Sequence, residues 1–167
     1  MRIQVLGQKA AEEYCKILNK RNGDKKYAVI SIVSPSSRNA DIIEGGQIKR
    51  IFRMKFYDVE KDFYQTRYLP FKKKYMKLRY PAPTAKDMNG LKEFVDSLVD
   101  IDNLIVHCGA GISRSAGIAS AIEKYLGMDD TIWCSKKYYP NRCVERVALE
   151  IFGISKDENY YSDVFSE

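Results

Sequence analysis

The stretch LIVHCGAGISRSAGIA, residues 104–119, decides the fold of this chain. It starts with a short apolar run that is typical of a buried strand, continues through a turn containing Gly109 and Gly111, and leads into a helical pattern that ends at Gly127. Such a turn directs consecutive backbone N–H groups and the positive end of the following helix toward one point. The sequence therefore predicts a strand, a loop and a helix that together bind phosphate or another oxyanion.

The residues of this loop exclude two other kinds of phosphate-binding loop. A dinucleotide-binding loop has a third glycine where this chain has Arg114, and the GxxxxGK[ST] pattern of nucleotide-hydrolysing enzymes does not occur. Here the loop begins with Cys108, and a thiol among N–H donors, beside a helix N-terminus and a guanidinium, is expected to have a lowered pKa and to be nucleophilic. Arg114 offers two parallel donors to phosphoryl oxygens, and Ser115 can donate its hydroxyl to the thiolate. These residues predict phosphoryl transfer to Cys108.

HCGAGISRS, residues 107–115, resembles the signature HCxxGxxR, followed by Ser or Thr, of the cysteine-dependent protein tyrosine phosphatases, and in particular of their small dual-specificity phosphatase-like branch. YYPNRCVERVALEIFG, residues 138–153, is similar to the Pro-Asn helix of these enzymes, so the resemblance covers residues 27–153. It implies that His107 braces the loop without acid–base work, and that no metal and no cofactor take part. The residues that it implies for phosphate binding are Gly109, Ala110, Gly111, Ile112, Ser113 and Arg114.

The same resemblance implies an aspartate on a separate upstream loop, which protonates the leaving oxygen and later activates water. KFYDVE, residues 55–60, is similar to the corresponding stretch and indicates Asp58. The separation between Asp58 and the loop cysteine is longer than is usual in compact members, so Glu60 and Asp62 remain alternatives. Ser113 is interpreted as a cap of the following helix.

The other cysteines are expected to be structural. Cys15 and Arg21 repeat the spacing of the loop's cysteine and arginine, but they lie in a helical pattern without glycines, so this match is interpreted as coincidence. Cys134 and Cys143 are expected to be core or helix-face thiols, and a protective disulfide with Cys108 stays open. With four cysteines, one histidine and no CxxC pair, the chain fits neither a disulfide scaffold nor a Cys/His zinc site.

The hydrophobic periodicity predicts an α/β fold with a mostly parallel central sheet flanked by helices, in one phosphatase domain over residues 1–167. Strands are expected at 2–6, 27–33, 48–57 and 103–107, and helices at 8–20, 84–99, 115–127, 129–139 and 141–153. Alternation within 52–57 indicates a half-buried strand near an edge of the sheet. Thr84 and Asn141 are expected to be N-caps, and residues 58–83 a long connection.

The composition, with 45% hydrophobic and 30% charged residues, is that of a globular protein. No apolar run reaches the roughly 18 residues that span a bilayer, and the first residues lack the apolar stretch of a signal peptide, so a cytoplasmic location is expected. The net charge of +6 equals the charge of one segment, RYLPFKKKYMKLR (67–79), which contains no acid. This segment lies in an insertion of about residues 60–83, and the acidic tail, about 154–167, is expected to be poorly ordered.

The basic segment fits two interpretations. A run of charges is usually a solvated face. Alternatively, it raises the local potential for a phosphate-rich substrate, for RNA or for an acidic partner, with aromatic residues to stack on bases or to pack on a peptide. Its position between Asp58 and the cysteine loop favours a rim of the active site, with Lys72, Lys73, Lys74, Lys77 and Arg79 as its candidate residues.

Together these features predict a metal-independent phosphomonoesterase of the dual-specificity type. It would remove phosphate from phosphotyrosine, and also from phosphoserine or phosphothreonine, in phosphorylated proteins through a cysteinyl-phosphate intermediate. A lipid substrate is less favoured, because the loop contains no lysine. An RNA 5′-phosphatase of the same superfamily and a non-catalytic phosphate-binding module are the two alternatives.

Overall fold

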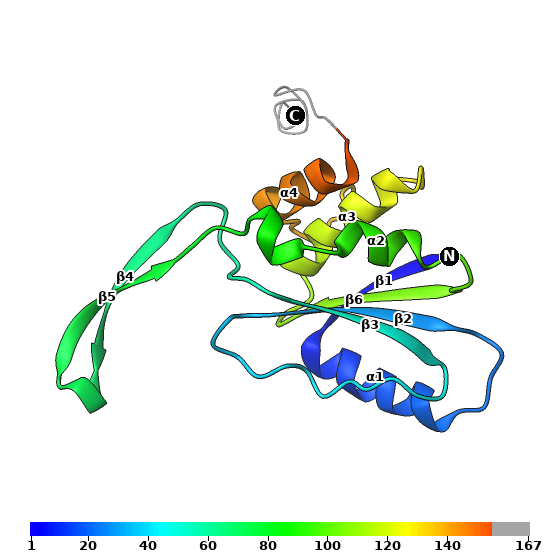
Figure 1. Ribbon diagram of the computed structural model, residues 1–167, viewed down its shortest axis with the longest axis horizontal. Helices are drawn as coiled ribbons and strands as arrows, with labels where there is room; N and C mark the ends of the chain where they lie inside the picture. Colours follow the sequence, from blue (N-terminus) through cyan, green and yellow to red (C-terminus); the bar gives the residue numbers. More distant parts are fainter. Residues whose placement is uncertain (155–167) are drawn as a thin grey trace.

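In the computed structural model, which describes residues 1–154, helices cover both faces of a four-stranded sheet (Figure 1). The strands are β1 (Arg2–Gly7), β2 (Tyr27–Val33), β3 (Ile48–Lys55), β4 (Phe63–Leu69), β5 (Lys74–Tyr80) and β6 (Asn103–Cys108). The α-helices are α1 (Gln8–Lys20), α2 (Leu91–Asp96), α3 (Arg114–Tyr125) and α4 (Arg142–Phe152), and two 3₁₀ turns are η1 (Pro70–Lys72) and η2 (Ala85–Met88). The sheet has the order β1-β6-β2-β3 and all its pairs are parallel, which confirms the predicted fold class.

Each face of the sheet has its own core, because α1 covers one face and α2, α3 and α4 cover the other (Figure 1). β2 is therefore buried along its whole length, as expected for a strand between two helical layers. Its side chains alternate between the faces: Ile30 and Ile32 pack with the α2–α4 layer, and Val29 packs with α1. β3 is the outermost strand on its side, so the predicted edge position is confirmed.

The same alternation decides where the loop cysteine points. Val106 and Cys108 belong to the core that contains α3, whereas Ile105 belongs to the core that contains α1. Because side chains alternate along a strand, His107 lies on the α1 side. The sheet thus separates the loop cysteine from the histidine that precedes it.

The long connection expected over residues 58–83 contains a hairpin, for which the sequence analysis predicted no strands. β4 pairs with β5 in antiparallel register from Phe63 opposite Tyr80 to Leu69 opposite Lys74, and the hairpin projects from the body of the molecule (Figure 1). The alternation in KYMKLRY is a strand pattern. It was inconclusive in the sequence because a two-stranded sheet with no core beside it has no buried apolar face to distinguish it from a loop.

Two predicted helices are also wrong in extent or kind. The helix expected over 84–99 is divided, because Gly90 takes a left-handed conformation (φ 81°) between η2 and α2, and Val99 is 94% exposed rather than part of an apolar face. The expected Thr84 cap is present, as a capping box with Asp87. Residues 129–139 form turns instead of a helix.

The turns at 129–139 have a tertiary cause. The Ile132 amide donates to Glu123 (2.9 Å) and the Tyr139 amide donates to the Ile112 carbonyl (3.1 Å), so backbone donors that a helix would use internally bind other segments. α4 then begins as expected, with Asn141 as its N-cap accepting from the Val144 amide, and ends at Gly153. None of the helices within residues 1–154 combines the length and the apolar character needed to cross a membrane. The acidic tail, beyond Ile154, lies outside the described residues.

Candidate active site

The loop between β6 and α3 is held against the junction of β1 and α1. Gly111 has φ 73°, and a Cβ atom there would lie 2.3 Å from the Gly7 nitrogen and from the Leu6 carbonyl carbon. The Gln8 amide donates to the Gly109 carbonyl at 3.1 Å. Only glycine fits at position 111, because both the backbone conformation and the close approach of β1 exclude a side chain.

The Cys108 thiol lies at the centre of this loop. Its Sγ is 3.1 Å from the Ser115 hydroxyl and accepts a hydrogen bond from the Gly111 amide at 3.3 Å. Burial of Cys108 raises its pKa, but hydrogen bonds from the Ser115 hydroxyl, from the Ser115 and Gly111 amides, and the charge of Arg114 outweigh it, so the pKa of Cys108 is lowered from its ordinary value. The site thus favours a thiolate.

Cys15 shows what burial does without such donors. It is as buried as Cys108, on the α1 side of the sheet, and burial raises its pKa to about 11. Cys15 and Arg21 have the same spacing as Cys108 and Arg114, but spacing by itself supplies no hydrogen bonds to the sulfur, so this match is a coincidence.

The Arg114 side chain is buried and donates hydrogen bonds to the segments that follow β2 and β3. Its Nη1 donates to the Phe56 carbonyl at the end of β3 (2.9 Å) and to the Ser34 hydroxyl after β2 (3.4 Å). A Cβ atom on Gly109 would lie 3.7 Å from its Nη2, so the guanidinium lies over the loop. Two strand ends therefore orient the predicted phosphate-binding arginine.

Asp58 is brought to the loop, and its two alternatives are not. Its Oδ1 accepts from the Ser113 hydroxyl (2.7 Å) and from Asn141 Nδ2 (3.0 Å), and its Oδ2 is 3.7 Å from Arg114 Nε. The Asp58 side chain is 39% exposed, so it can reach both a substrate and water.

The two alternative acids have other partners. Glu60 accepts from the Arg142 amide at 3.2 Å. Asp62 closes the base of the β4–β5 hairpin: it accepts from the Ala82 amide and from Arg79, and these two contacts lower its pKa. Both carboxylates are thus engaged away from the cysteine loop.

Asn141 is a site residue that sequence reasoning placed only as a helix cap. Its amide donates to the Ser113 carbonyl (3.2 Å), its Oδ1 caps α4, and its Nδ2 donates to Asp58. It is 3% exposed, so these contacts are shielded from solvent. Ser113 occupies the N-cap position of α3, as interpreted, but its side chain makes no capping hydrogen bond, because its hydroxyl donates to Asp58 instead.

His107 is fully buried, and burial lowers its pKa to about 4. It is therefore neutral at physiological pH, which does not suit proton transfer from this ring. Neither ring nitrogen has a hydrogen-bond partner among the described residues, so the expected bracing of the loop stays a prediction. The remaining loop residues, Ala110 and Ile112, lie between the glycines and Ser113, and Ile112 is 41% exposed.

The candidate rim residues are not gathered around the cysteine loop. Lys72, Lys73 and Lys74 lie at the far end of the hairpin, which points away from the body in Figure 1. Arg79 lies nearer the base and pairs with Asp62 at 2.7 Å.

All four cysteines are free thiols, so the protective disulfide that the sequence left open is absent. Cys143 is buried in α4, and burial raises its pKa. Cys134 is exposed, so the expectation of a core or helix-face thiol is wrong for this residue. Within residues 1–154, no group of three or more His, Cys, Asp or Glu side chains is placed to hold a metal ion.

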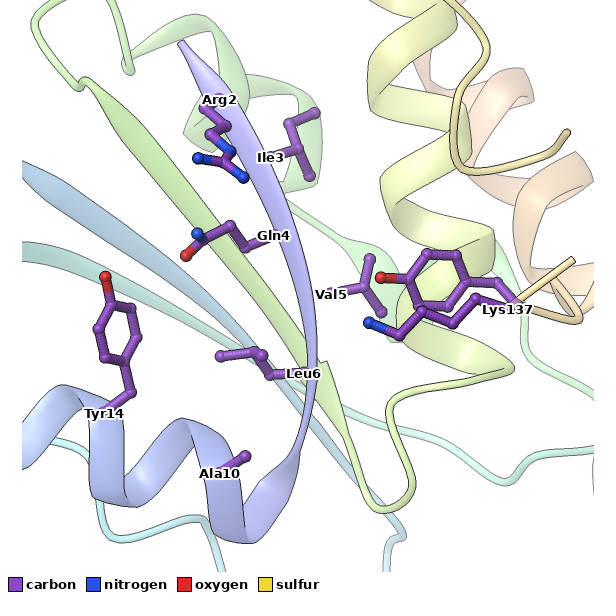
Figure 2. A pocket seen from close by; sticks show the side chains of 9 residues that line it. Arg2, Ile3, Gln4, Val5, Leu6, Ala10, Tyr14 and Lys137 are labelled. Atoms are coloured by element: carbon purple, nitrogen blue, oxygen red, sulfur yellow. The ribbon is translucent and has the colours of Figure 1, made fainter. Parts of the chain in front are cut away.

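Pockets also lie outside the loop itself. One, of about 460 Å³, follows the open edge of β1, and Tyr14, Lys137 and Tyr138 complete its lining (Figure 2). Another, of about 410 Å³, is lined by Glu60, Trp133, Tyr139, Arg142 and neighbouring residues. This second pocket adjoins the site, because Glu60 follows Asp58 closely and Tyr139 is bonded to the loop at Ile112.

No protein-family model matches the sequence, and no curated protein matches it. Among solved structures, the chain is similar to the human tyrosine phosphatase-like serine/threonine/tyrosine-interacting protein, with a TM-score of 0.54 and 19% sequence identity. The similarity covers 90% of this chain and 91% of the human protein. The chain therefore has the fold of a tyrosine phosphatase-like protein, as the cysteine-loop signature predicted.

Proposed function

We propose that the protein is a phosphomonoesterase that uses Cys108 as its nucleophile and acts on phosphotyrosine, and also on phosphoserine or phosphothreonine, in proteins. The observation that carries this proposal is the convergence of a thiol of lowered pKa, a buried arginine and Asp58 on one glycine loop. Thiolate, guanidinium and carboxylic acid are the groups that two-step phosphoryl transfer needs.

In the first step, the Cys108 sulfur attacks phosphorus while the bond from phosphorus to the leaving oxygen breaks. Asp58 gives its proton to that oxygen, and Arg114 with the amides of residues 109–114 holds the other phosphoryl oxygens. In the second step, Asp58 takes a proton from water, the resulting hydroxide attacks phosphorus, and the sulfur–phosphorus bond breaks. Ser115 donates to the departing thiolate, and inorganic phosphate is released.

Two features support a protein substrate. The loop holds no lysine to bind additional phosphates of a phosphoinositide, since Gly109, Ala110 and Ile112 occupy the variable positions. The pocket between Glu60 and Tyr139 adjoins the loop and is lined by aromatic and charged side chains, which suits a peptide residue next to the phosphorylated one.

The test is hydrolysis of a small aryl phosphate in the presence of EDTA. We expect turnover by the wild type, inhibition by vanadate, loss of turnover in Cys108→Ser, and reduced turnover in Asp58→Asn. Cys134→Ser is the matched control, because it changes an exposed thiol outside the loop. Cys134 lines the neighbouring pocket, but a small aryl phosphate has no peptide residue to place there, so this variant should keep full activity. Full turnover by Cys108→Ser would overturn the mechanism, and activity restricted to RNA 5′-phosphates would replace the proposed substrate class.

A non-catalytic phosphate-binding module is the second candidate. It is favoured by the structural neighbour, which is named as tyrosine phosphatase-like and as an interacting protein. Such a module would bind a phosphopeptide equally well as wild type and as Cys108→Ser, and neither protein would release phosphate. Measuring binding by calorimetry beside phosphate release distinguishes the two candidates.

A further inference from the structure

The β4–β5 hairpin has two faces of different chemistry. Residues that pair across antiparallel strands share a face. One face, called the tyrosine face from here on, holds Tyr64, Thr66, Tyr68, Tyr75, Lys77 and Arg79. The opposite face, called the apolar face, holds Phe63, Gln65, Arg67, Leu69, Lys74, Met76, Leu78 and Tyr80. Leu69, Met76, Leu78 and Tyr80 are half-buried, whereas every residue of the tyrosine face is exposed.

The rings on the tyrosine face are accessible and lie among cations. Tyr68 is 46% exposed and Tyr75 is 73% exposed, and their ring centroids are 5.2 Å apart with the planes tilted by 55°. Lys77 Nζ lies 4.7 Å from the centroid of the Tyr64 ring on the same face. Tyrosines exposed in this number on a narrow ribbon are unusual for a solvated surface, because each leaves apolar area in water.

The charge of the hairpin has one sign. Residues 63–80 contain six basic side chains and no acid, which equals the net charge of the whole chain. At the base, Arg79 is paired with Asp62. At the turn, Lys72 Nζ lies 5.9 Å from the centroid of the Phe71 ring, and Phe71 is 78% exposed. The hairpin therefore complements a polyanion along its whole length.

We propose that the tyrosine face of the β4–β5 hairpin binds single-stranded nucleic acid. Bases stack on Tyr68 and Tyr75, and Lys77 with the lysines of the turn holds the phosphates. Aromatic residues on an exposed sheet face beside cations are the arrangement that stacks unpaired bases and follows their backbone. This site is separate from the cysteine loop and does not depend on catalysis.

Other polyanions fit the hairpin less well. An acidic peptide would neutralise the lysines, but its Asp and Glu side chains have no ring to stack on the tyrosines. An anionic membrane would be met by the apolar side chains of the tip, Pro70 and Phe71, whereas the tyrosines lie along the strands. Single-stranded nucleic acid satisfies both the rings and the charges.

The hairpin would place a bound strand near the active site. Its base is closed by Asp62, which accepts from the Ala82 amide at 3.0 Å, and Tyr57 packs edge-on against Tyr80 with ring centroids 4.9 Å apart. Tyr57 directly precedes Asp58. Tyr80 belongs to the apolar face, so a nucleic acid that extends to the base of the tyrosine face lies across the ribbon from this contact with the Asp58 segment.

The test is fluorescence anisotropy with a labelled single-stranded oligouridylate of about 16 nucleotides. The label occupies the 5′ end, so the probe carries no terminal phosphate for the cysteine loop to bind, and failure of the proposed phosphatase activity would not affect this result. We expect binding that weakens as salt rises. Tyr75→Ala should weaken binding about tenfold, whereas Phe63→Ala, its control on the apolar face, should bind as the wild type.

Charge is tested by a second matched pair. Lys77→Gln should lower the slope of log affinity against log salt by about 0.7, the loss of one phosphate contact on a single strand, and Arg67→Gln on the apolar face should keep the slope. All four substituted residues are exposed, so unfolding midpoints in urea should stay the same and aryl phosphate turnover of Tyr75→Ala should not change.

The proposal is overturned by absence of binding at low salt, or by equal losses in Tyr75→Ala and Phe63→Ala. It is also overturned if phosphatidylserine vesicles or polyglutamate bind the hairpin while the oligonucleotide does not.

Discussion

The hydrogen bond between Ser115 and Cys108 allows the sharpest test of the thiolate. The two atoms are 3.1 Å apart and Ser115 is fully buried, so water cannot replace the hydroxyl in Ser115→Ala without reorganising the loop. A hydrogen bond to a charged group contributes about 1.5–3 kcal/mol. Since 1.36 kcal/mol is a tenfold change in the ratio of the two protonation states, the variant should have a thiolate-to-thiol ratio about 10- to 100-fold lower at a given pH.

The assay is the ultraviolet absorbance of the thiolate as a function of pH, with the curve of Cys108→Ser subtracted. Burial raises the pKa of both Cys15 and Cys143, so these thiols titrate at higher pH than Cys108. The midpoint assigned to Cys108 should move to higher pH in Ser115→Ala. Ser113→Ala is the matched control, because its hydroxyl donates to Asp58 and not to the sulfur, and the midpoint should stay where it is.

A kinetic measurement completes the test. A poorer thiolate is also a poorer leaving group, so in Ser115→Ala the release of phosphate should slow relative to the release of the aryl alcohol, and a burst of alcohol should appear. A Cys108 midpoint that is unchanged in Ser115→Ala, or equally displaced in Ser113→Ala, would refute the reasoning that this hydroxyl stabilises the charged sulfur.

Three further predictions concern other contacts. Asn141→Ala should lower stability by about 1 kcal/mol through loss of the α4 cap. It should also slow hydrolysis of an alkyl phosphate more than that of an aryl phosphate, because it removes one of the hydrogen bonds that hold Asp58, the proposed general acid. Equal slowing of both substrates would contradict the positioning role. The pKa of His107 is about 4 in the folded protein and near 6.5 in the unfolded chain. The free energy of unfolding therefore contains a contribution from this residue that is complete above pH 6.5 and is lost as the pH falls toward 4, about 3 kcal/mol in all. The free energy of unfolding in urea, measured across this pH range, should fall more steeply in the wild type than in His107→Gln. Parallel dependence on pH in the two proteins would count against this prediction. Lys124→Met should destabilise the fold by about 3–5 kcal/mol, because Glu145 is fully buried 2.8 Å from Lys124 Nζ, whereas Glu145→Leu added to it should restore most of the urea midpoint.

The strand, loop and helix around Cys108 could be predicted because their signals are local. The apolar run of β6, the glycines of the loop and the cap and end of α4 each depend on a few neighbouring residues. Where a local signal lacked its usual tertiary partner, prediction failed. The β4–β5 hairpin has no core beside it. In the turns at 129–139, backbone amides donate hydrogen bonds to Glu123 and to the cysteine loop instead of to a helix.

The sequence by itself determined which residue types the loop contains, and hence predicted an anion site beside a reactive thiol. Only the tertiary structure decided which side chains surround that thiol. Asn141 reaches Asp58 across 83 positions, and Arg114 is anchored on the Phe56 carbonyl across 58. Periodicity tells which face of an element is buried but not which distant segment covers it, because that depends on the path of the whole chain. For the same reason the excess of basic charge was visible in the sequence, while its distribution over the hairpin, with Lys77 and Arg79 on the face that carries three tyrosines, required the strand register.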